Sequence, residues 1–232
     1  MEKINGIKSW PTSERPRERL NKHGVQSLSD AELLAILLRN GIQGKDAITL
    51  ARELLNRFGG LRGLAKIEWA DLAKIKGLGP AKISTFLAAA EMARRQLRQE
   101  LIGTNFVRNP ESVLDYLYST LRDTKKEIFK VLFLNKANRI LDEKDLFEGT
   151  VDETAVYPRE LVKAALERHA TSLILIHNHP SGRIEPSLED REITRKLQTA
   201  CNAVSIKILD HIIVGDNQYF SFNEHSMLTL AP

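Results

Sequence analysis

The stretch LILIHNHPSGRIEPSLED, residues 173–190, contains the end of one secondary-structure element and the start of the next. Its first four residues form an apolar run typical of a buried strand, which Pro180 and Gly182 end. Ser187 stands where a helix N-cap is expected, so the pattern predicts a helix from near Leu188 to about Cys201. A strand followed by a helix indicates a mixed α/β domain.

Three polar side chains of this stretch are candidates for one metal site. Because side chains alternate along a strand, His177 and His179 point to one face and Asn178 to the other. Asp190 lies in the first turn of the predicted helix and faces back toward the end of the strand. Two histidines and a carboxylate leave one tetrahedral position of zinc open, as in catalytic zinc sites.

A structural interpretation of each part also exists. Ser187 and Asp190 have the spacing of a capping box, and a single histidine at a strand end is usually only polar. Burying two imidazoles beside a carboxylate is harder to explain by packing, because it costs desolvation energy unless a partner organises the groups. The combination therefore favours metal binding.

The residues around this stretch predict the rest of a mixed sheet, in a domain that spans residues 104–232. Residues 127–134 and 139–147 form a predicted β-hairpin around a turn at 135–138. Pro158 is the expected first residue of a helix that runs to about His169. Residues 206–209, 211–214 and 219–222 are predicted as strands.

The first 103 residues have a different pattern and predict a small all-helical domain. From Ser29 to Arg98 the apolar residues recur at intervals of three and four, and glycines divide this stretch into short helices. Ser29 and Asp46 are the expected N-caps of two of them.

Residues 75–82, IKGLGPAK, resemble a helix-hairpin-helix motif. The hairpin at Gly77–Gly79 would expose backbone N–H groups near a helix N-terminus that Pro80 opens, with Lys76 and Lys82 adding charge. Such groups contact the phosphate backbone, so DNA contact would be weak, nonspecific and sensitive to salt. The alternative, that the glycines only let two helices pack closely, stays open.

Composition limits the class of protein. The 232 residues are 42% hydrophobic and 28% charged, which is typical of a globular chain that is not disordered. The longest apolar run, residues 33–38, is too short to span a membrane, and residues 1–10 lack the apolar segment of a secretion signal. Cys201 is the only cysteine, which excludes an intrachain disulfide. We expect a cytoplasmic protein with no membrane partner.

Charge differs between the two halves. Residues 1–103 hold 18 Lys and Arg against 11 Asp and Glu, whereas residues 104–232 hold 16 against 19. The basic half could face a polyanion or could simply present a solvated helical surface.

The motif HNHP at residues 177–180, with S-x-x-D at 187–190 separated from the second histidine by seven residues, resembles the JAMM (MPN+) metallopeptidase motif. The longer matches HNHPSG, LFEGTVD at 146–152 and YPRE at 157–160 are similar to the RadC-like branch of that family. The resemblance covers the whole chain and implies an MPN domain of cytidine-deaminase-like fold.

The resemblance also implies roles for individual residues. One zinc ion would be held by His177, His179 and Asp190, with Ser187 beside its bound water and suited to donate to the oxyanion. In that family a glutamate acts as acid and base, and the matching position in this chain is Glu127. Alternation along the strand places Glu127 on the same face as Phe129. The implied reaction is hydrolysis of a peptide or isopeptide bond in an unidentified protein or peptide.

Two questions stay open at this point. The chain could instead be a DNA-associated repair or recombination factor whose zinc is structural or acts on nucleic acid. Asp210 and His211 could contact the metal ligands without binding the metal themselves. The favoured interpretation is that they are simply a polar pair at the start of a strand. The substrate and the oligomeric state do not follow from the sequence.

Overall fold

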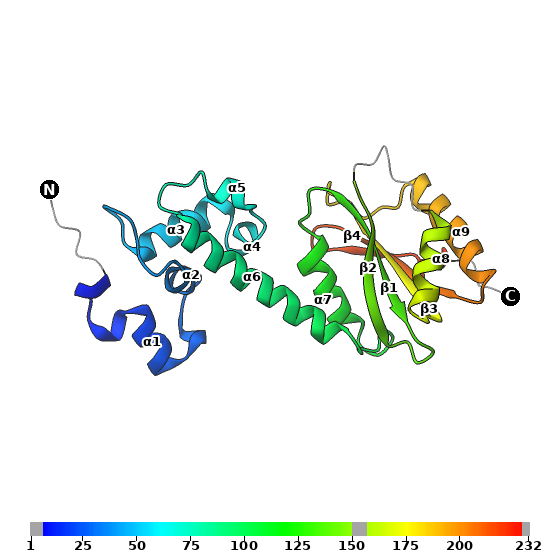
Figure 1. Ribbon diagram of the computed structural model, residues 1–232, viewed down its shortest axis with the longest axis horizontal. Helices are drawn as coiled ribbons and strands as arrows, with labels where there is room; N and C mark the ends of the chain where they lie inside the picture. Colours follow the sequence, from blue (N-terminus) through cyan, green and yellow to red (C-terminus); the bar gives the residue numbers. More distant parts are fainter. Residues whose placement is uncertain (1–6, 150–156, 229–232) are drawn as a thin grey trace. The chain divides into compact units, whose positions relative to one another are not determined.

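The computed structural model describes residues 7–149 and 157–228, without the side chains of Lys8 and Glu148. The chain divides into two compact units, Met1–Ala93 and Arg94–Pro232 (Figure 1). The division falls within the long helix α6, Pro80–Leu101. The domain boundary at 103/104 stays a prediction from the sequence.

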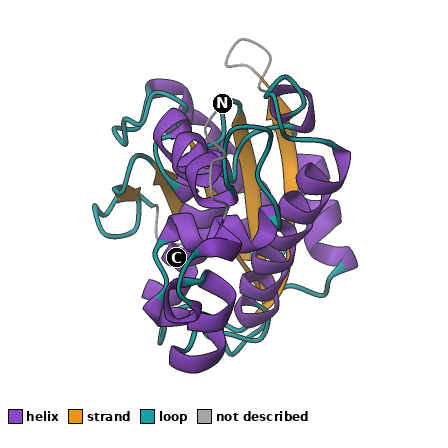
Figure 2. Ribbon diagram, turned by 90° about the vertical axis from the view of Figure 1, so that its left-hand side faces the viewer, coloured by secondary structure: helices purple, strands orange, loops and turns teal. Residues whose placement is uncertain are grey.

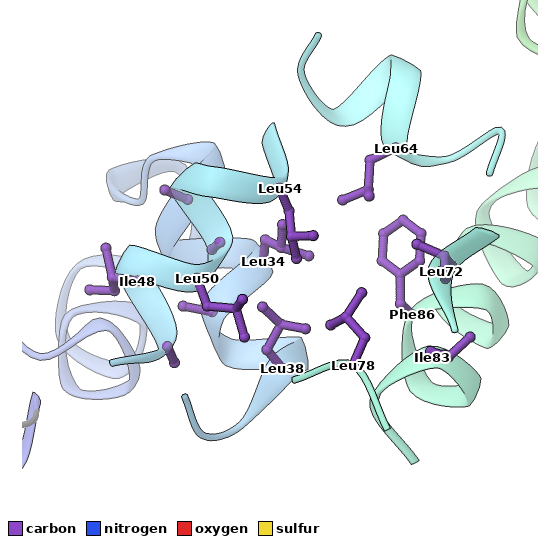
Figure 3. Close-up of a cluster of buried hydrophobic side chains, with 14 residues drawn as sticks. Leu34, Leu38, Ile48, Leu50, Leu54, Leu64, Leu72, Leu78, Ile83 and Phe86 are labelled. Carbon is purple, nitrogen blue, oxygen red and sulfur yellow. The ribbon is translucent and has the colours of Figure 1, made fainter. Parts of the chain in front are cut away.

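The N-terminal unit is helical, as predicted. Its elements are η1 (Ile7–Ser9), η2 (Thr12–Glu14), α1 (Pro16–His23), η3 (Val25–Ser27), α2 (Asp30–Leu38), α3 (Ala47–Phe58), α4 (Leu61–Leu64), α5 (Trp69–Leu72) and the first part of α6. Apolar side chains from α2, α3, α5 and α6 form one core that includes Leu34, Leu54 and Phe86 (Figure 3). Apolar burial of this kind is the main stabilising contribution to a helical domain.

Both predicted helix caps of this unit are present. Ser29 forms a reciprocal capping box with Glu32 at the start of α2, and Glu32 also forms an ion pair with Arg19. At the start of α3 the Asp46 carboxylate accepts a hydrogen bond from the backbone N–H of Thr49. These side chains supply partners for N–H groups that the first turn of a helix leaves unpaired.

The predicted hairpin before α6 is packed against the loop after α2. Gly77 has φ +97°, and a Cβ there would lie 2.3 Å from Cγ2 of Ile42. The Lys82 ammonium donates hydrogen bonds to the carbonyl oxygens of Gly41 (3.1 Å) and Gly77 (3.0 Å), and partial burial lowers its pKa. Glycine at this position therefore has a packing role whatever else the hairpin binds.

The C-terminal unit contains a five-stranded mixed sheet, which confirms the predicted fold class. Its strands are β1 (Glu127–Leu134), β2 (Ile140–Gly149), β3 (Ser172–Asn178), β4 (Lys207–Val214) and β5 (Tyr219–Ser221), in the order β2-β1-β3-β4-β5. Strands β1 and β2 form the predicted hairpin, and only the β3–β4 pair of this sheet is parallel. In Figure 2 the strands are orange and the helices purple.

Helices cover both faces of this sheet. On one face α8 (Pro158–Glu167) and α9 (Leu188–Asn202) pack against alternate residues of β1 and β3, among them Phe129 and Leu175. On the other face α7 (Pro110–Leu121) packs against the residues in between, such as Ile174 and Ile176. Helix α7 was not predicted from the sequence, although Pro110 at its first turn and the spacing of its apolar residues are helix signals.

None of the helices within the described residues is both long enough and apolar enough to cross a membrane.

Candidate metal centre

The first two candidate ligands lie where β3 ends in the centre of the sheet. His177 is the second-last residue of β3 and is 1% exposed, and the Nε2 atoms of His177 and His179 are 3.0 Å apart. A turn follows, in which Gly182 (φ +77°) donates its N–H to the carbonyl oxygen of His179. The turn places the carbonyl oxygen of Arg183 within hydrogen-bond distance, 2.9 Å, of Nδ1 of His179. Local backbone geometry thus fixes the second imidazole.

The third candidate ligand is positioned by the N-cap of α9. Asp190 accepts hydrogen bonds at Oδ2 from the backbone N–H and the hydroxyl of Ser187, both at 2.7 Å. The N–H of Asp190 donates to Ser187 Oγ at 3.0 Å, which completes a capping box. The other carboxylate oxygen, Oδ1, lies 3.1 Å from Nε2 of His177. The capping box therefore leaves one carboxylate oxygen directed at the histidines.

These three residues could hold a metal ion. One ligand atom from each of His177, His179 and Asp190 lies within 4.8 Å of the other two. A carbonyl oxygen only accepts, so Nδ1 of His179 carries the proton that bonds to Arg183 and its Nε2 is left for a ligand. Two imidazole nitrogens 3.0 Å apart beside a carboxylate need a cation or a proton between them. The donor set, two nitrogens and one carboxylate oxygen, suits zinc.

The electrostatics of the cluster favour a positive charge at its centre. Hydrogen bonding to Asp190 raises the pKa of His179 above its usual range, although burial opposes this shift. Burial would raise the pKa of Asp190, but its contacts with His177, His179 and Ser187 outweigh burial and hold that pKa far below its usual range. Without metal, a proton on His179 therefore pairs with the Asp190 carboxylate. A metal ion would have to displace that proton.

Glu127, the acid and base implied by the resemblance, begins β1 on the face of the cluster. Phe129, two residues further along β1, pairs with His177, and their rings stack with centroids 6.1 Å apart. Because side chains alternate, Glu127 shares this face, and its charge adds to the raised pKa of His179. Glu127 is half-buried and lies outside the ligand set.

Asn178 lies between the two histidines on the opposite face, as predicted, and is buried. Its amide oxygen accepts the N–H of Ile128 at 2.9 Å, and its amide nitrogen donates to the carbonyl oxygen of Lys126 at 3.1 Å. These two residues flank Glu127, so the Asn178 side chain holds the backbone on both sides of it. No sequence pattern indicated these contacts of Asn178.

The sequence favoured His211 as a polar residue at a strand start, and this interpretation is wrong, because His211 lies inside β4. It is fully buried in β4, and its Nε2 lies 2.8 Å from Nδ1 of His177. Burial, with the neighbouring His177, lowers the pKa of His211 well below its usual range, so the ring is neutral. Parallel pairing of β4 with β3 places His211 opposite Leu175, on the face of His177. The signal was a polar pair within the apolar run ILDHIIV.

Asp210, its neighbour, is buried but has another role. Its carboxylate accepts hydrogen bonds from the Ser221 hydroxyl and from the backbone N–H groups of His211 and Asn223, and burial raises its pKa. Asp210 thus ties the end of β5 to β4.

The fold and the cluster together define a JAB-type domain with a candidate metal site. Residues 107–227 match the family described as RadC-like JAB domain, and residues 7–84 match the UPF0758 N-terminal region. The chain belongs to the UPF0758 family of RadC-like proteins, which confirms the resemblance seen in its motifs. Of the motif at 146–152, Thr150 to Asp152 lie outside the described residues.

Relatives match over nearly the whole chain. A UPF0758 protein from Pseudomonas fluorescens strain Pf-5 is 48% identical over 96% of this chain and 99% of its own length. One from Azotobacter vinelandii is also 48% identical, over 96% of this chain and 100% of its own length. One from Shewanella woodyi is 44% identical, over 96% and 99% respectively. Both units are therefore shared with these relatives.

Proposed function

We propose that this chain is a zinc-dependent hydrolase of the JAMM metallopeptidase type that cleaves a peptide or isopeptide bond. The observation that carries the proposal is the convergence of His177, His179 and Asp190, with the Glu127 carboxylate on the same face and outside the ligand set. A three-ligand set that leaves one position open is typical of catalytic zinc. Membership of the RadC-like JAB family supports the same activity.

Each polar group at the centre has a defined task in this proposal. When bound, zinc lowers the pKa of water from 15.7 to about 7 and polarises a carbonyl group. The Nε2 atoms of both histidines and Oδ1 of Asp190 would hold the ion. The Glu127 carboxylate would take a proton from the attacking water and deliver it to the leaving nitrogen. Asn178 would keep Glu127 in place through the backbone on either side of it.

Ser187 is the proposed donor to the substrate carbonyl oxygen, where negative charge develops. In this structure its hydroxyl hydrogen is donated to Asp190 Oδ2. Catalysis would therefore require the hydroxyl to turn from the carboxylate toward the substrate.

The proposal is tested by comparing zinc content and hydrolysis in three purified proteins. Wild type is expected to bind one zinc ion per chain and to cleave a member of a panel of peptide and isopeptide substrates. Glu127→Gln should keep the zinc ion and lose hydrolysis by about a hundredfold or more. The control, Glu192→Gln, removes the same charge from an exposed site on α9 and should behave as wild type. Wild type that stays zinc-free after reconstitution would refute the proposal.

We propose weak DNA binding by the N-terminal unit as a second function. A cavity of about 750 Å³ lies beside the start of α6, and its lining includes Arg17, Arg39 and Lys82 together with Gly77 and Gly79. Three cationic side chains along one cavity suit a phosphate backbone. Such binding would be independent of sequence.

DNA binding is tested with a labelled duplex over a salt series. The double variant Arg17→Gln/Arg39→Gln should bind more weakly and reduce the salt slope by about 2, since each lost phosphate contact changes it by about 1. Arg52→Gln, an exposed substitution on α3, is the matched control. Glu127→Gln should leave binding unchanged. Absence of binding by wild type at about 50 mM salt would refute this function.

A further inference from the structure

Both ring nitrogens of His177 have partners on the protein. Nε2 faces Asp190 Oδ1 at 3.1 Å and His179 Nε2 at 3.0 Å. Nδ1 faces Nε2 of His211 at 2.8 Å. The tautomer of His177 decides whether a lone pair or an N–H group points at the candidate metal position, since a neutral imidazole has one of each.

The hydrogen-bond directions behind His177 can be worked out from Thr194. The Thr194 hydroxyl donates to the carbonyl oxygen of Asp190 at 2.5 Å, so its oxygen can only accept from His211 Nδ1, which lies 2.6 Å away. The neutral ring of His211 then carries its proton on Nδ1 and has a lone pair on Nε2. That lone pair accepts the Nδ1 proton of His177. His177 is left with its lone pair on Nε2, directed at Asp190 and His179.

We propose that His211 and Thr194 are positioning residues that fix the tautomer and ring orientation of His177 for metal binding. The inference rests on the metal site of the proposed function. Its basis is a hydrogen-bond chain that starts at one ligand, His177 on β3, and ends at the backbone carbonyl of another, Asp190 on α9. His177, His211 and Thr194 are each no more than 2% exposed, so water does not compete for these bonds.

A role in packing alone is the alternative for His211. Its ring stacks on Phe222 with centroids 4.8 Å apart and lies tilted against Phe129 at 5.6 Å. Packing would require the shape of the ring but not the Thr194 hydroxyl. The hydroxyl therefore separates the two interpretations.

Thr194→Val removes the hydroxyl and keeps the branched shape, whereas Thr194→Ser keeps the hydroxyl. Zinc affinity, measured by competition with a chelating dye, should fall about 10- to 100-fold in Thr194→Val, the range for lost support of a metal ligand, and recover in Thr194→Ser. The matched control is Thr199→Val on the same helix, where the hydroxyl also donates to the carbonyl four residues earlier but is exposed. This control should bind zinc as wild type does.

The second readout is the side-chain ¹⁵N spectrum of the metal-free protein at about pH 8. In wild type, His177 and His211 should both show a protonated Nδ1 and an unprotonated Nε2. Thr194→Val should show mixed tautomers at His211, and Thr194→Ser should show the wild-type pattern. His211→Gln, which can still offer His177 an acceptor, should bind zinc more tightly than His211→Leu.

Two results would overturn the inference. One is a wild-type spectrum with the proton of His177 on Nε2, which needs no variant to fold. The other is a folded Thr194→Val protein with wild-type tautomers and zinc affinity. Wild type that binds no zinc would instead refute the proposed function, and the spectrum would still decide the tautomer.

Discussion

Two helices of this chain begin with the same local arrangement, a serine and an acid in a capping box. At α2 the Glu32 carboxylate accepts from the N–H and hydroxyl of Ser29, both at 2.9 Å. At α9 Asp190 accepts the same two bonds from Ser187 at 2.7 Å. Within one turn of helix, the two sites are chemically alike.

The two boxes differ in what the rest of the chain brings to the second carboxylate oxygen. Glu32 Oε1 faces the Arg19 guanidinium, a permanent cation that completes an ion pair. Asp190 Oδ1 faces Nε2 of His177, and the second imidazole lies beside it. Imidazoles can be neutral, so the second box leaves a position that a metal cation can fill. The partner that tertiary structure supplies, and not the local motif, separates a helix cap from a candidate metal site.

The largest expected contrast between the boxes is their response to zinc. At a zinc concentration about 1,000 times Kd, zinc should raise the free energy of unfolding of wild type by about 4 kcal/mol. His177→Ala and Asp190→Ala should lose this gain because each removes a ligand, whereas Glu32→Ala should keep it. Denaturant unfolding with zinc and with chelator measures the difference. A zinc gain that persists in His177→Ala would place the ion elsewhere.

Much of the site was predictable because it is encoded locally. The end of β3, the turn at Gly182 and the N-cap at Ser187 all lie within 18 residues, and each has its own sequence signal. The mixed sheet followed from alternating apolar patterns and turn residues in the same way.

The rest depended on contacts between distant residues. His211 contacts His177 only because β4 pairs parallel to β3, and no local pattern reveals that register. Thr194 resembles any helical threonine until His211 is placed beside it. Asn178 was placed on the correct face, but its bonds to the residues around Glu127 require the alignment of β1 with β3. The sequence pattern predicted the candidate ligands but not the contacts that hold them.

The second contrast concerns the charge of Glu32 in the capping box of α2. Burial would raise the pKa of Glu32, but its bonds to Ser29 and Arg19 outweigh burial and lower the pKa. Glu32→Gln should therefore reduce the free energy of unfolding at pH 7 by about 1.5–3 kcal/mol, the range for hydrogen bonds to a charged group. The stabilisation is present above the unfolded pKa of about 4.3 and is lost as pH falls through the lower folded value. A penalty that is equal at pH 7 and at about pH 3 would contradict this explanation.

The third contrast is the effect of high pH on the metal-free protein. His179 has a raised folded pKa, so its pairing with Asp190 stabilises the chain fully below the unfolded value of about 6.5 and is lost as pH rises through the folded value. The unfolding penalty of Asp190→Asn should therefore shrink with rising pH in that window. The penalty of Glu32→Gln should stay constant there, because Arg19 does not titrate. Parallel urea titrations in chelator provide the measurement, and equal trends in both variants would contradict the assignment.

The smallest expected effects come from the two serines. Ser29→Ala and Ser187→Ala each remove an N-cap hydroxyl, so each should lower the free energy of unfolding by about 1 kcal/mol. Only Ser187→Ala should also weaken zinc binding, because the Ser187 hydroxyl orients the Asp190 carboxylate. The loss of zinc affinity should be less than about tenfold, the lower end of the range for removing a partner of a metal ligand. The reason is that the backbone N–H of Ser187 still donates to Asp190 Oδ2. Equal zinc affinity in both serine variants would show that the backbone alone positions Asp190, and the two boxes would then differ only in their partners.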